Sequence, residues 1–177
     1  MPEDTRPPVG ETAVLAAVQS RLATPATVSA ARTLSHFGEH AAGWMAVSAL
    51  GAVLAPRRRR DWLMVGVGAL AAHAAAVIIK QVVRRRRPDH PDVAVNVATP
   101  SSLSFPSAHA TSSTAAAMLL CRATRSPLPL VVVPLMAASR LVLGVHYPTD
   151  VIAGVAVGAA VARATGRLAG SGEGDRP

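Results

Sequence analysis

Residues 105–109 read Phe105-Pro106-Ser107-Ala108-His109, a short polar stretch between two strongly apolar parts of the chain. Pro106 ends a loop, and Ser107 is a good N-cap for a following helix. The free backbone N–H groups at such a helix start attract anions, and His109 falls in the first turn beside them. A lone histidine at a helix start is more often an ordinary polar end, so an anion site here depends on the flanking residues.

The composition on both sides is typical of a membrane protein. Of the 177 residues 50% are apolar but only 3% are aromatic, and the mean hydropathy is +0.34. A soluble core of this size would use more large aromatic side chains, whereas small residues let helices pack closely in lipid. The length suits one domain. We therefore expect an all-α, integral-membrane helical bundle of about six helices.

Apolar runs predict where these helices lie. We expect four to five clear transmembrane spans, drawn from residues 41–55 (with a start near Phe37), 62–79, 107–121, 128–143 and 150–168. Residues 84–106 are rich in proline and are expected to form a loop. Residues 144–149 should separate the last two helices. The single cysteine, Cys121, lies in an apolar run and is expected to be a small buried side chain rather than a nucleophile.

The N-terminal region is expected to lie on the membrane, with a full crossing by residues 11–36 as the alternative that Arg21, Arg32 and His36 disfavour. Residues 11–36 predict one or two helices with a break near Pro25. An apolar stripe on the first of them predicts an amphipathic interfacial helix, with Gln19 and Arg21 on the opposite face; the stripe comprises Val14, Leu15, Val18 and Leu22. Residues 1–10 are expected to be disordered, 11–168 to form the single membrane domain, and 169–177 to form a flexible tail. Residues 1–4 are acidic rather than basic, so no secretory signal is expected.

The net charge of +8 is compatible with nucleic acid, anionic lipid or a phosphorylated substrate. No nucleic acid is expected, because the arginines lie at the ends of apolar runs rather than along a polar face. Alternating crossings put eight arginines on one side of the membrane and six cations, including Lys80, Arg87 and Arg140, on the other. The positive-inside tendency then predicts a multi-pass plasma-membrane protein with the polar stretch on its outer face.

Two groups of residues flank this stretch in the sequence. Lys80 and Arg87 would share a face if their helix continued that far, although such a basic run by itself more often binds lipid headgroups. Arg140 lies near the end of an apolar helix, where a charge is costly without a partner. If the last helix starts at Pro148, Asp150 can face His146 and leave one ring nitrogen free as a nucleophile or base.

In this order and spacing, these residues resemble the type 2 phosphatidic acid phosphatase family, also called lipid phosphate phosphatases. The family's first motif, Lys-x6-Arg-Pro, is matched by Lys80 and Arg87-Pro88. Its second, Pro-Ser-Gly-His, is matched by residues 106–109, and its third, Ser-Arg-x5-His-x3-Asp, by Ser139-Arg140, His146 and Asp150. The resemblance covers residues 80–150. It departs at Ala108, where the family usually has glycine; the backbone N–H remains, but Cβ adds bulk.

The resemblance implies a role for each matched residue. His146 would attack phosphorus to form a phosphohistidine, Asp150 would orient it, and His109 would protonate the leaving oxygen and then activate water. The phosphate oxygens would be bound by side chains and backbone N–H groups of Lys80, Arg87, Ser107, Ala108 and Arg140. Fixed cations would replace the metals of other phosphoryl-transfer enzymes, so no metal or cofactor is expected.

The compact, Ala- and Arg-rich chain looks like a bacterial branch of this family. That resemblance implies a polyprenyl-linked substrate, such as decaprenylphosphoryl-phosphoribose in cell-wall synthesis. Undecaprenyl pyrophosphate, phosphatidylglycerophosphate and phosphatidic acid remain alternatives, because the motifs read the phosphate and not the tail or sugar. The expected partners are the lipid phosphate and membrane lipids, with the oligomeric state open. The non-enzyme alternative is a polybasic membrane scaffold that binds anionic lipid.

A second histidine-containing pattern, at residues 36–40, suggests a metal site instead. His36-Phe37-Gly38-Glu39-His40 fits the His-x-x-Glu-His pattern of an inverted zinc-peptidase helix. A catalytic zinc needs a third protein ligand, and Gly38 weakens the helix, so zinc is not favoured. These residues are instead expected near the outer face, where they would line the entrance for the lipid headgroup. His73, in the middle of an apolar run, is expected to be a neutral interhelical hydrogen-bonder.

Overall fold

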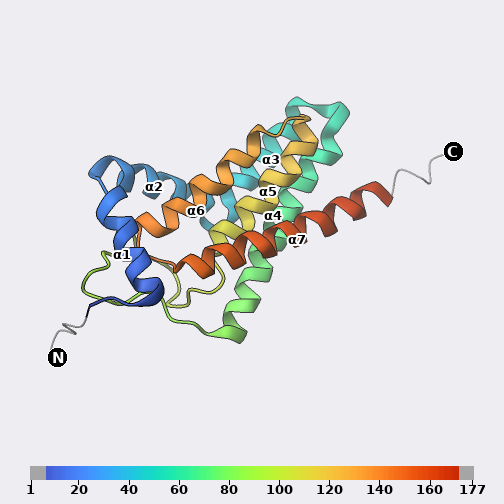
Figure 1. Cartoon of the computed structure of the whole chain (residues 1–177). Helices are drawn as coiled ribbons and strands as arrows, with labels where there is room; N and C mark the ends of the chain where they lie inside the picture. The colour runs from blue at the N-terminus through green and yellow to red at the C-terminus, as the bar shows by residue number, and fades with distance from the viewer. Residues whose placement is uncertain (1–6, 172–177) are drawn as a thin grey trace.

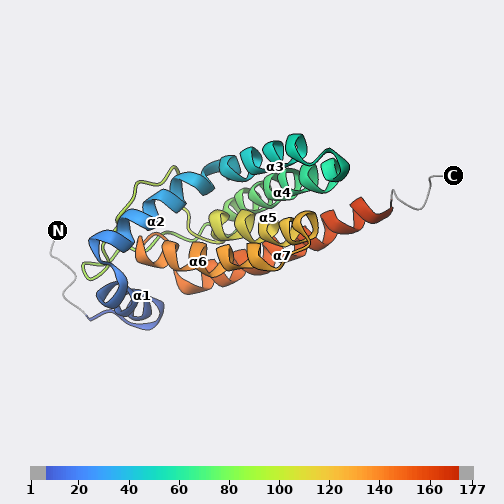
Figure 2. The same cartoon turned by 90° about the horizontal axis from the view of Figure 1, so that it is seen from above.

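The computed structural model describes residues 7–171, which form an elongated bundle of helices (Figures 1 and 2). In chain order the elements are α1 (Gly10–Leu22), α2 (Pro25–Gly38), η1 (Glu39–Ala41), α3 (Ala42–Leu54), η2 (Pro56–Arg58), α4 (Arg59–Val83), α5 (Ala108–Thr124), η3 (Leu128–Val131), α6 (Val132–Val142) and α7 (Pro148–Ser171). No strand occurs in this described range. The predicted all-α class is therefore confirmed.

Helix α5 is the centre of the bundle and is built from small residues. Its residues 110–117 are all buried and are alanine, serine or threonine. Helices α4 and α7 pack along it. On α7, Gly158 approaches so closely that an added Cβ would lie 2.3 Å from the carbonyl oxygen of Thr111. Small side chains thus let α5 and α7 pack backbone against backbone, as helices commonly do in lipid.

Large apolar side chains face outward instead. Several on α3, α4 and α7 are between 65% and 78% exposed: Val53, Leu54, Ile78, Val82 and Ile152. This distribution is the reverse of a soluble domain's and suits a lipid environment. Among the described residues, two helices are long and apolar enough to cross a membrane: Pro56–Val83, with mean hydropathy 2.1, and Pro148–Leu168, with 1.4. The segment Leu128–Val142 is apolar but shorter.

The bundle has two chemically different ends. At one end η2, the last turn of α5 and the last turns of α7 come together (Figure 1). There Arg58 donates to the carbonyl of Ala123 at 3.0 Å, and Arg122 donates to the carbonyl of Gly166 at 3.1 Å. Helix α1, the first half of α2 and the loop of residues 84–107 lie at the other end (Figures 1 and 2). The arginines assigned to one side of the membrane thus belong to segments at one end of the bundle.

One expected helix start is wrong. Phe37 belongs to α2, and α3 begins only at Ala42, because His40 and Ala41 have left-handed backbones with φ of 49° and 60°. Helix α4 ends at Val83, in agreement with the loop expected from residue 84, and Arg84 forms a left-handed C-cap with φ 53°. Arg87 therefore lies on the loop, and it does not share a helix face with Lys80.

Helix α1 also differs from its expected pattern, because Gln19 is buried rather than outward-facing. Its amide donates to the carbonyls of Ala94 at 2.7 Å and Val142 at 3.0 Å, and accepts from the N–H of Ala94 at 3.0 Å. Gly144, with φ 70°, allows this close approach, since a Cβ there would lie 2.3 Å from the Ala94 oxygen. Hydrogen bonds to the loop thus decide which face of α1 is buried.

The outermost helices reach slightly beyond the expected domain range. Helix α1 starts at Gly10 and α7 ends at Ser171, so the helices extend beyond the expected range of 11–168. The expectations for residues 1–6 and 172–177 lie outside the described residues.

Candidate active site

The helix start predicted at Ser107 is present. Ser107 is the N-cap of α5: its Oγ accepts from the N–H of Ala110 at 3.4 Å, and its side chain is fully buried. Its own N–H donates to the carbonyl of Asp150 at 2.9 Å. The peptide bond before Pro106 is cis. The polar stretch is thereby tied to the first turn of α7, although the two are far apart in the sequence.

A cavity of about 420 Å³ lies beside this junction. Six of the predicted site residues line it: Lys80, Arg87, Ala108, His109, Arg140 and His146. They come from α4, α5, α6 and the two loops at this end of the bundle. Ser107 and Asp150 are both 0% exposed and stand behind the cavity wall rather than in it. The structure therefore brings the three sequence groups together around one volume.

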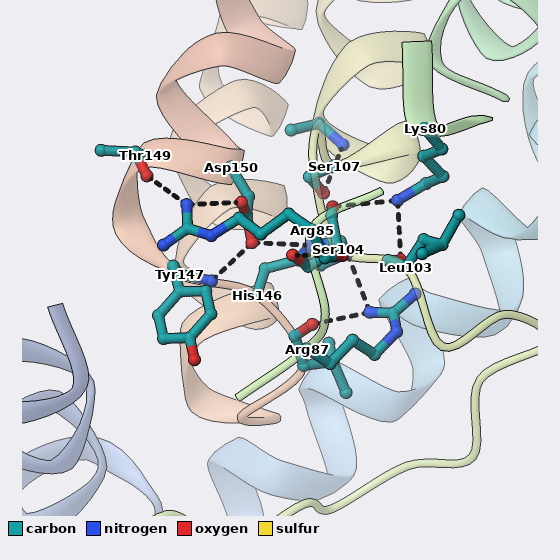
Figure 3. A network of polar contacts seen from close by, with 12 residues as sticks. Lys80, Arg85, Arg87, Leu103, Ser104, Ser107, His146, Tyr147, Thr149 and Asp150 are labelled. Carbon is teal, nitrogen blue, oxygen red and sulfur yellow. Dashed lines mark hydrogen bonds and ion pairs between the residues drawn. The ribbon is translucent and has the colours of Figure 1, made fainter. Parts of the chain in front are cut away.

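His146 is held between a carboxylate and a guanidinium (Figure 3). Its Nδ1 lies 3.5 Å from Oδ2 of Asp150, and its Nε2 lies 3.2 Å from Nη1 of Arg87. Because arginine can only donate, Nε2 accepts and the ring proton belongs on Nδ1, facing Asp150. Burial lowers the pKa of His146 to about 3, with Arg87 and Lys80 adding to the effect and Asp150 opposing it. The imidazole is therefore neutral at ordinary pH, with a lone pair on Nε2.

Asp150 has a second partner that the sequence did not reveal. Nη1 of Arg85 donates to Oδ1 of Asp150 at 3.0 Å, while the N–H of Tyr147 donates to Oδ2 at 2.8 Å (Figure 3). The same guanidinium lies 4.1 Å above the centre of the Tyr147 ring. Both carboxylate oxygens are thus occupied, which fixes the group that faces His146. Arg85 is one of four consecutive arginines, and no local pattern distinguishes it from its neighbours.

Arg85 also connects the site to α1. Its Nη2 lies 2.5 Å from Oε2 of Glu11, and the other carboxylate oxygen of Glu11 accepts from the N–H and hydroxyl of Thr149 at 2.9 and 2.7 Å. Burial acts against the charge of Arg85, but the bond to Glu11 and the nearby Asp150 prevail and raise its pKa. The first helix is therefore attached directly to the start of α7.

Two of the predicted cations are fixed by loop carbonyls (Figure 3). Nζ of Lys80, which is only 6% exposed, donates to the carbonyls of Leu103 at 3.0 Å and Ser104 at 2.9 Å. Arg87 donates to the carbonyls of Ser101 at 2.8 Å and Val145 at 2.6 Å. Burial lowers the pKa of Arg87 to about 10, so it is still charged at neutral pH.

Arg140 is the third cation, and it is almost completely buried at 1% exposure. It donates to the hydroxyls of Ser139 and Ser35, both at 3.1 Å, and to the carbonyl of Ala31 at 3.4 Å. Within residues 7–171 it forms no ion pair with a carboxylate. A buried guanidinium that bonds only to neutral oxygens is suited to binding an anion. We refer to Lys80, Arg87 and Arg140 together as the cationic cup.

His109 lies in the first turn of α5, as predicted, and is oriented by α2. Its Nε2 lies 2.9 Å from the carbonyl oxygen of Ser35, which can only accept, so Nε2 carries a proton. The other ring nitrogen, Nδ1, is then the one available for proton transfer. Ser35 bonds to both His109 and Arg140, and no motif in the sequence pointed to it.

The zinc-like pattern does not lie on one helix. Gly38 is the last residue of α2, and the left-handed His40 follows in η1, so the two histidines are not on successive turns of one face. Across the described chain, no group of three or more His, Cys, Asp or Glu side chains is placed to hold a metal ion. His36, Glu39 and His40 do line the cavity. Cys121 is partly buried and outside it.

Comparison with known proteins agrees with these motifs. Residues 61–170 match the model of the PAP2 superfamily. The chain is 64% identical over 157 residues to the decaprenylphosphoryl-5-phosphoribose phosphatase of Mycobacterium tuberculosis, covering 88% of this chain and 89% of that protein. It is 66% identical over 148 residues to the enzyme of the same name from Mycolicibacterium smegmatis, covering 83% and 82%.

The fold also has a counterpart among solved structures. It resembles the crystal structure of a transmembrane PAP2-type phosphatidylglycerolphosphate phosphatase from Bacillus subtilis, with a TM-score of 0.70. The likeness covers 92% of this chain and 86% of that one at 19% sequence identity, and at this level it shows the fold alone.

Proposed function

This chain belongs to the PAP2 superfamily and is a membrane phosphatase, and we propose that it removes the 5-phosphate of decaprenylphosphoryl-5-phosphoribose through a phosphohistidine intermediate. The observation that carries this proposal is the convergence of His146, His109 and the cationic cup around one cavity. The choice of substrate is supported by the 64% and 66% identity to relatives that bear this name.

In the first step, Nε2 of His146 attacks phosphorus and the bond from phosphorus to the leaving oxygen breaks. His109 enters the cycle protonated on both ring nitrogens, with the negative charge of the bound phosphate stabilising the imidazolium. It gives the leaving oxygen its Nδ1 proton, so the leaving group departs as an alcohol. The carboxylate of Asp150, 3.5 Å from Nδ1, stabilises the positive charge that develops on the attacking ring. The neutral state of His146 supports this role, because a protonated ring would have no lone pair to donate.

In the second step, water attacks the phosphohistidine. His109, now neutral at Nδ1, takes a proton from the water, and the bond between Nε2 and phosphorus breaks to release inorganic phosphate. Its Nε2–H remains on the Ser35 carbonyl throughout, which holds the ring in one orientation. Each proton given in the first step is recovered in the second, so the enzyme returns to its starting state.

The cationic cup would bind the non-bridging oxygens in both steps. Phosphoryl transfer needs positioning and charge stabilisation more than covalent chemistry. Three fixed cations, together with the free N–H groups at the start of α5, supply that stabilisation. The proposed mechanism therefore uses no metal and no cofactor.

We propose further that four to five of the helices α3–α7 cross the plasma membrane, with the site on the outer face. Support comes from the outward apolar side chains and from the eight arginines on segments opposite the site end, which the positive-inside tendency would retain in the cytoplasm. Helices α1 and α2 would lie beside the headgroups. A cysteine introduced beside the site and labelled by an impermeant reagent in intact cells tests this orientation.

The polybasic scaffold alternative is not supported. Exposed arginines such as Arg57, Arg59 and Arg60 could bind anionic lipid, but a scaffold does not need buried cations, and Lys80 and Arg140 are 6% and 1% exposed. The named relatives are phosphatases.

Phosphate release from a panel of purified lipid phosphates tests the proposed function. The panel holds decaprenylphosphoryl-5-phosphoribose, undecaprenyl pyrophosphate, phosphatidylglycerophosphate and phosphatidic acid. We expect the first to have the highest kcat/KM, and His146→Ala to lower phosphate release by about 1,000-fold or more. Acid-labile, base-stable labelling of wild-type protein by ³²P-substrate should also be absent in that variant. A higher kcat/KM for another substrate would reassign the specificity, and full activity in His146→Ala would exclude the mechanism.

A further inference from the structure

The cavity at the active site is larger than the cationic cup requires. Beyond the cup, its wall continues along four residues of α2, η1 and α4: His36, Glu39, His40 and His73. We call these four the imidazole arm. His73 lies two helical turns before Lys80 on α4, so the arm extends along the same face of that helix. The proposed chemistry uses none of these side chains.

The arm lies on the side of the cavity where the leaving alcohol would depart. Gly38, which directly precedes Glu39 and His40, packs against His109: a Cβ at Gly38 would lie only 2.7 Å from Cδ2 of that ring. In the proposed mechanism, His109 gives its proton to the leaving oxygen. The group attached to that oxygen must therefore occupy the space next to His109, and the arm borders that space.

Two features of the arm are energetically unfavourable: a left-handed backbone at His40 and a buried ring nitrogen of His73 without a hydrogen bond among the described residues. His40 and Ala41 have φ of 49° and 60°, a conformation that non-glycine residues rarely adopt and that recurs at ligand sites. The His40 ring lies 5.7 Å from the His73 ring, centre to centre. Nδ1 of His73 is buried, and within the described chain it has no hydrogen-bond partner. The interhelical bond expected of His73 is therefore not made by this nitrogen, and a buried unsatisfied group is costly.

We infer that the imidazole arm binds the hydroxyl groups of a sugar or similar polyol in the leaving alcohol, which is a deeper reading of the proposed function and rests on it. Each imidazole can donate or accept a hydrogen bond, as a hydroxyl can. A second phosphate fits the arm poorly because the arm contains the Glu39 carboxylate, which would repel it. Oε2 of Glu39 lies 3.9 Å from Nδ1 of His36. A plain alkyl chain would leave Nδ1 of His73 unsatisfied.

The test compares two substrates that differ only in these hydroxyls. One is a prenylphosphoryl-5-phosphoribose, and the other is its 2,3-dideoxy analogue with the same tail and both phosphates. The measured quantity is the ratio of their kcat/KM values in one preparation. Partial unfolding of a variant lowers both values equally and leaves this ratio unchanged. Wild type should favour the hydroxylated substrate by about tenfold or more, the discrimination expected from a hydrogen bond to a buried group.

Three variants separate hydrogen bonding from packing. His73→Leu removes the polar atoms, and we expect its ratio to fall close to one. His73→Asn is the matched control, because its amide places a polar atom near the position of Nδ1, and it should retain most of the ratio. His40→Gly removes the other ring while tolerating φ of 49°, and its ratio should fall as well.

The outcomes also distinguish this inference from the function on which it rests. If wild type releases phosphate from both substrates at equal kcat/KM, or if His73→Leu keeps the wild-type ratio, the hydroxyl site is excluded and the phosphatase assignment stands. If wild type releases phosphate from neither substrate, the proposed substrate is excluded, and the inferred hydroxyl site is excluded with it.

Discussion

Nη1 of Arg85 lies 3.0 Å from Oδ1 of Asp150, and the same guanidinium reaches Glu11 through Nη2 at 2.5 Å. One arginine thus joins the carboxylate behind His146 to the first helix of the chain. The Asp150 carboxylate is fixed in orientation, because its other oxygen, Oδ2, accepts from the N–H of Tyr147 at 2.8 Å. We therefore predict that Arg85 acts as a positioning residue, because it contacts Asp150 and does not line the cavity.

Arg85→Gln should lower kcat more than it changes KM. Without the guanidinium, Asp150 can turn away from Nδ1 of His146, and the charge that develops on the attacking ring is less well stabilised. We expect a fall in kcat of about 10- to 100-fold, smaller than the ~10⁴-fold loss on changing the carboxylate of a serine protease triad itself. Steady-state kinetics with the lipid substrate measure this, and Arg85→Lys should restore part of kcat.

The matched control is Arg86→Gln, which removes the same charge from the neighbouring exposed arginine. The groups that act on the Asp150 carboxylate are His146, Tyr147 and Arg85, and the Arg86 side chain is exposed. The Arg86→Gln variant should therefore keep kcat within about twofold of wild type. An equal loss of kcat in both variants would show that the loop's total charge matters and not the contact with Asp150.

Glu11→Gln should destabilise the protein at neutral pH and not at acidic pH. Burial tends to raise the pKa of Glu11, but hydrogen bonds from Arg85 and Thr149 prevail and lower it below 4.5. A carboxylate with a lowered pKa contributes stability that is complete above its unfolded value and disappears as pH falls through its folded value. The Tm difference between wild type and variant should thus be full at pH 7 and shrink below about pH 4.5. A difference that does not depend on pH would contradict an ionic role.

His146 should remain unprotonated across the whole range in which the enzyme works. Burial lowers its pKa from 6.5 to about 3, so its ring takes up a proton only well below pH 5. Ring ¹⁵N NMR of histidine-labelled protein, with the His146 signals assigned by their loss in His146→Ala, should show no titration of this ring between pH 8 and pH 5. A midpoint near 6.5 would mean that the ring is solvated and that the site is more open than the structure shows.

Gly158→Ala should destabilise the bundle, although alanine is the better helix former. The new Cβ would lie 2.3 Å from the Thr111 carbonyl, so α7 would have to move away from α5. Gly166→Ala on the same helix is the control: there the added Cβ meets only the flexible guanidinium of Arg122. It should be neutral or stabilising, by up to about 1 kcal/mol from helix propensity. Thermal unfolding in detergent compares the two, and equal Tm values would show that the close contact is not required.

Many features of this fold could be predicted from the sequence because they depend on residues close together along the chain. Apolar runs broken by prolines and arginines predicted the positions of α4, α5 and α7, since each helix must present an apolar surface to lipid or to its neighbours. Ser107 was recognised as an N-cap because capping depends on adjacent residues only. The residues lining the cup were found through motif spacing, which reflects chemistry that needs those side chains in that order.

The partners of those residues had to come from the folded molecule. Ser35 and Arg85 contact site residues across 65 or more positions of sequence separation, and Glu11 contacts Arg85 across 74. Nothing beside these three residues in the sequence marks them out. Gln19 was placed on the wrong face because hydrogen bonds from a distant loop outweighed its local pattern.

The sequence alone determined the apolar helical segments, the helix start at Ser107 and the three motifs from which we predict the reacting groups, because hydropathy, capping and motif spacing depend on residues close together along the chain. Only the tertiary structure decided how those groups are oriented and what stands beside them. An ion pair or a hydrogen bond forms wherever packing brings two side chains within about 3 Å, and that distance depends on every helix between them.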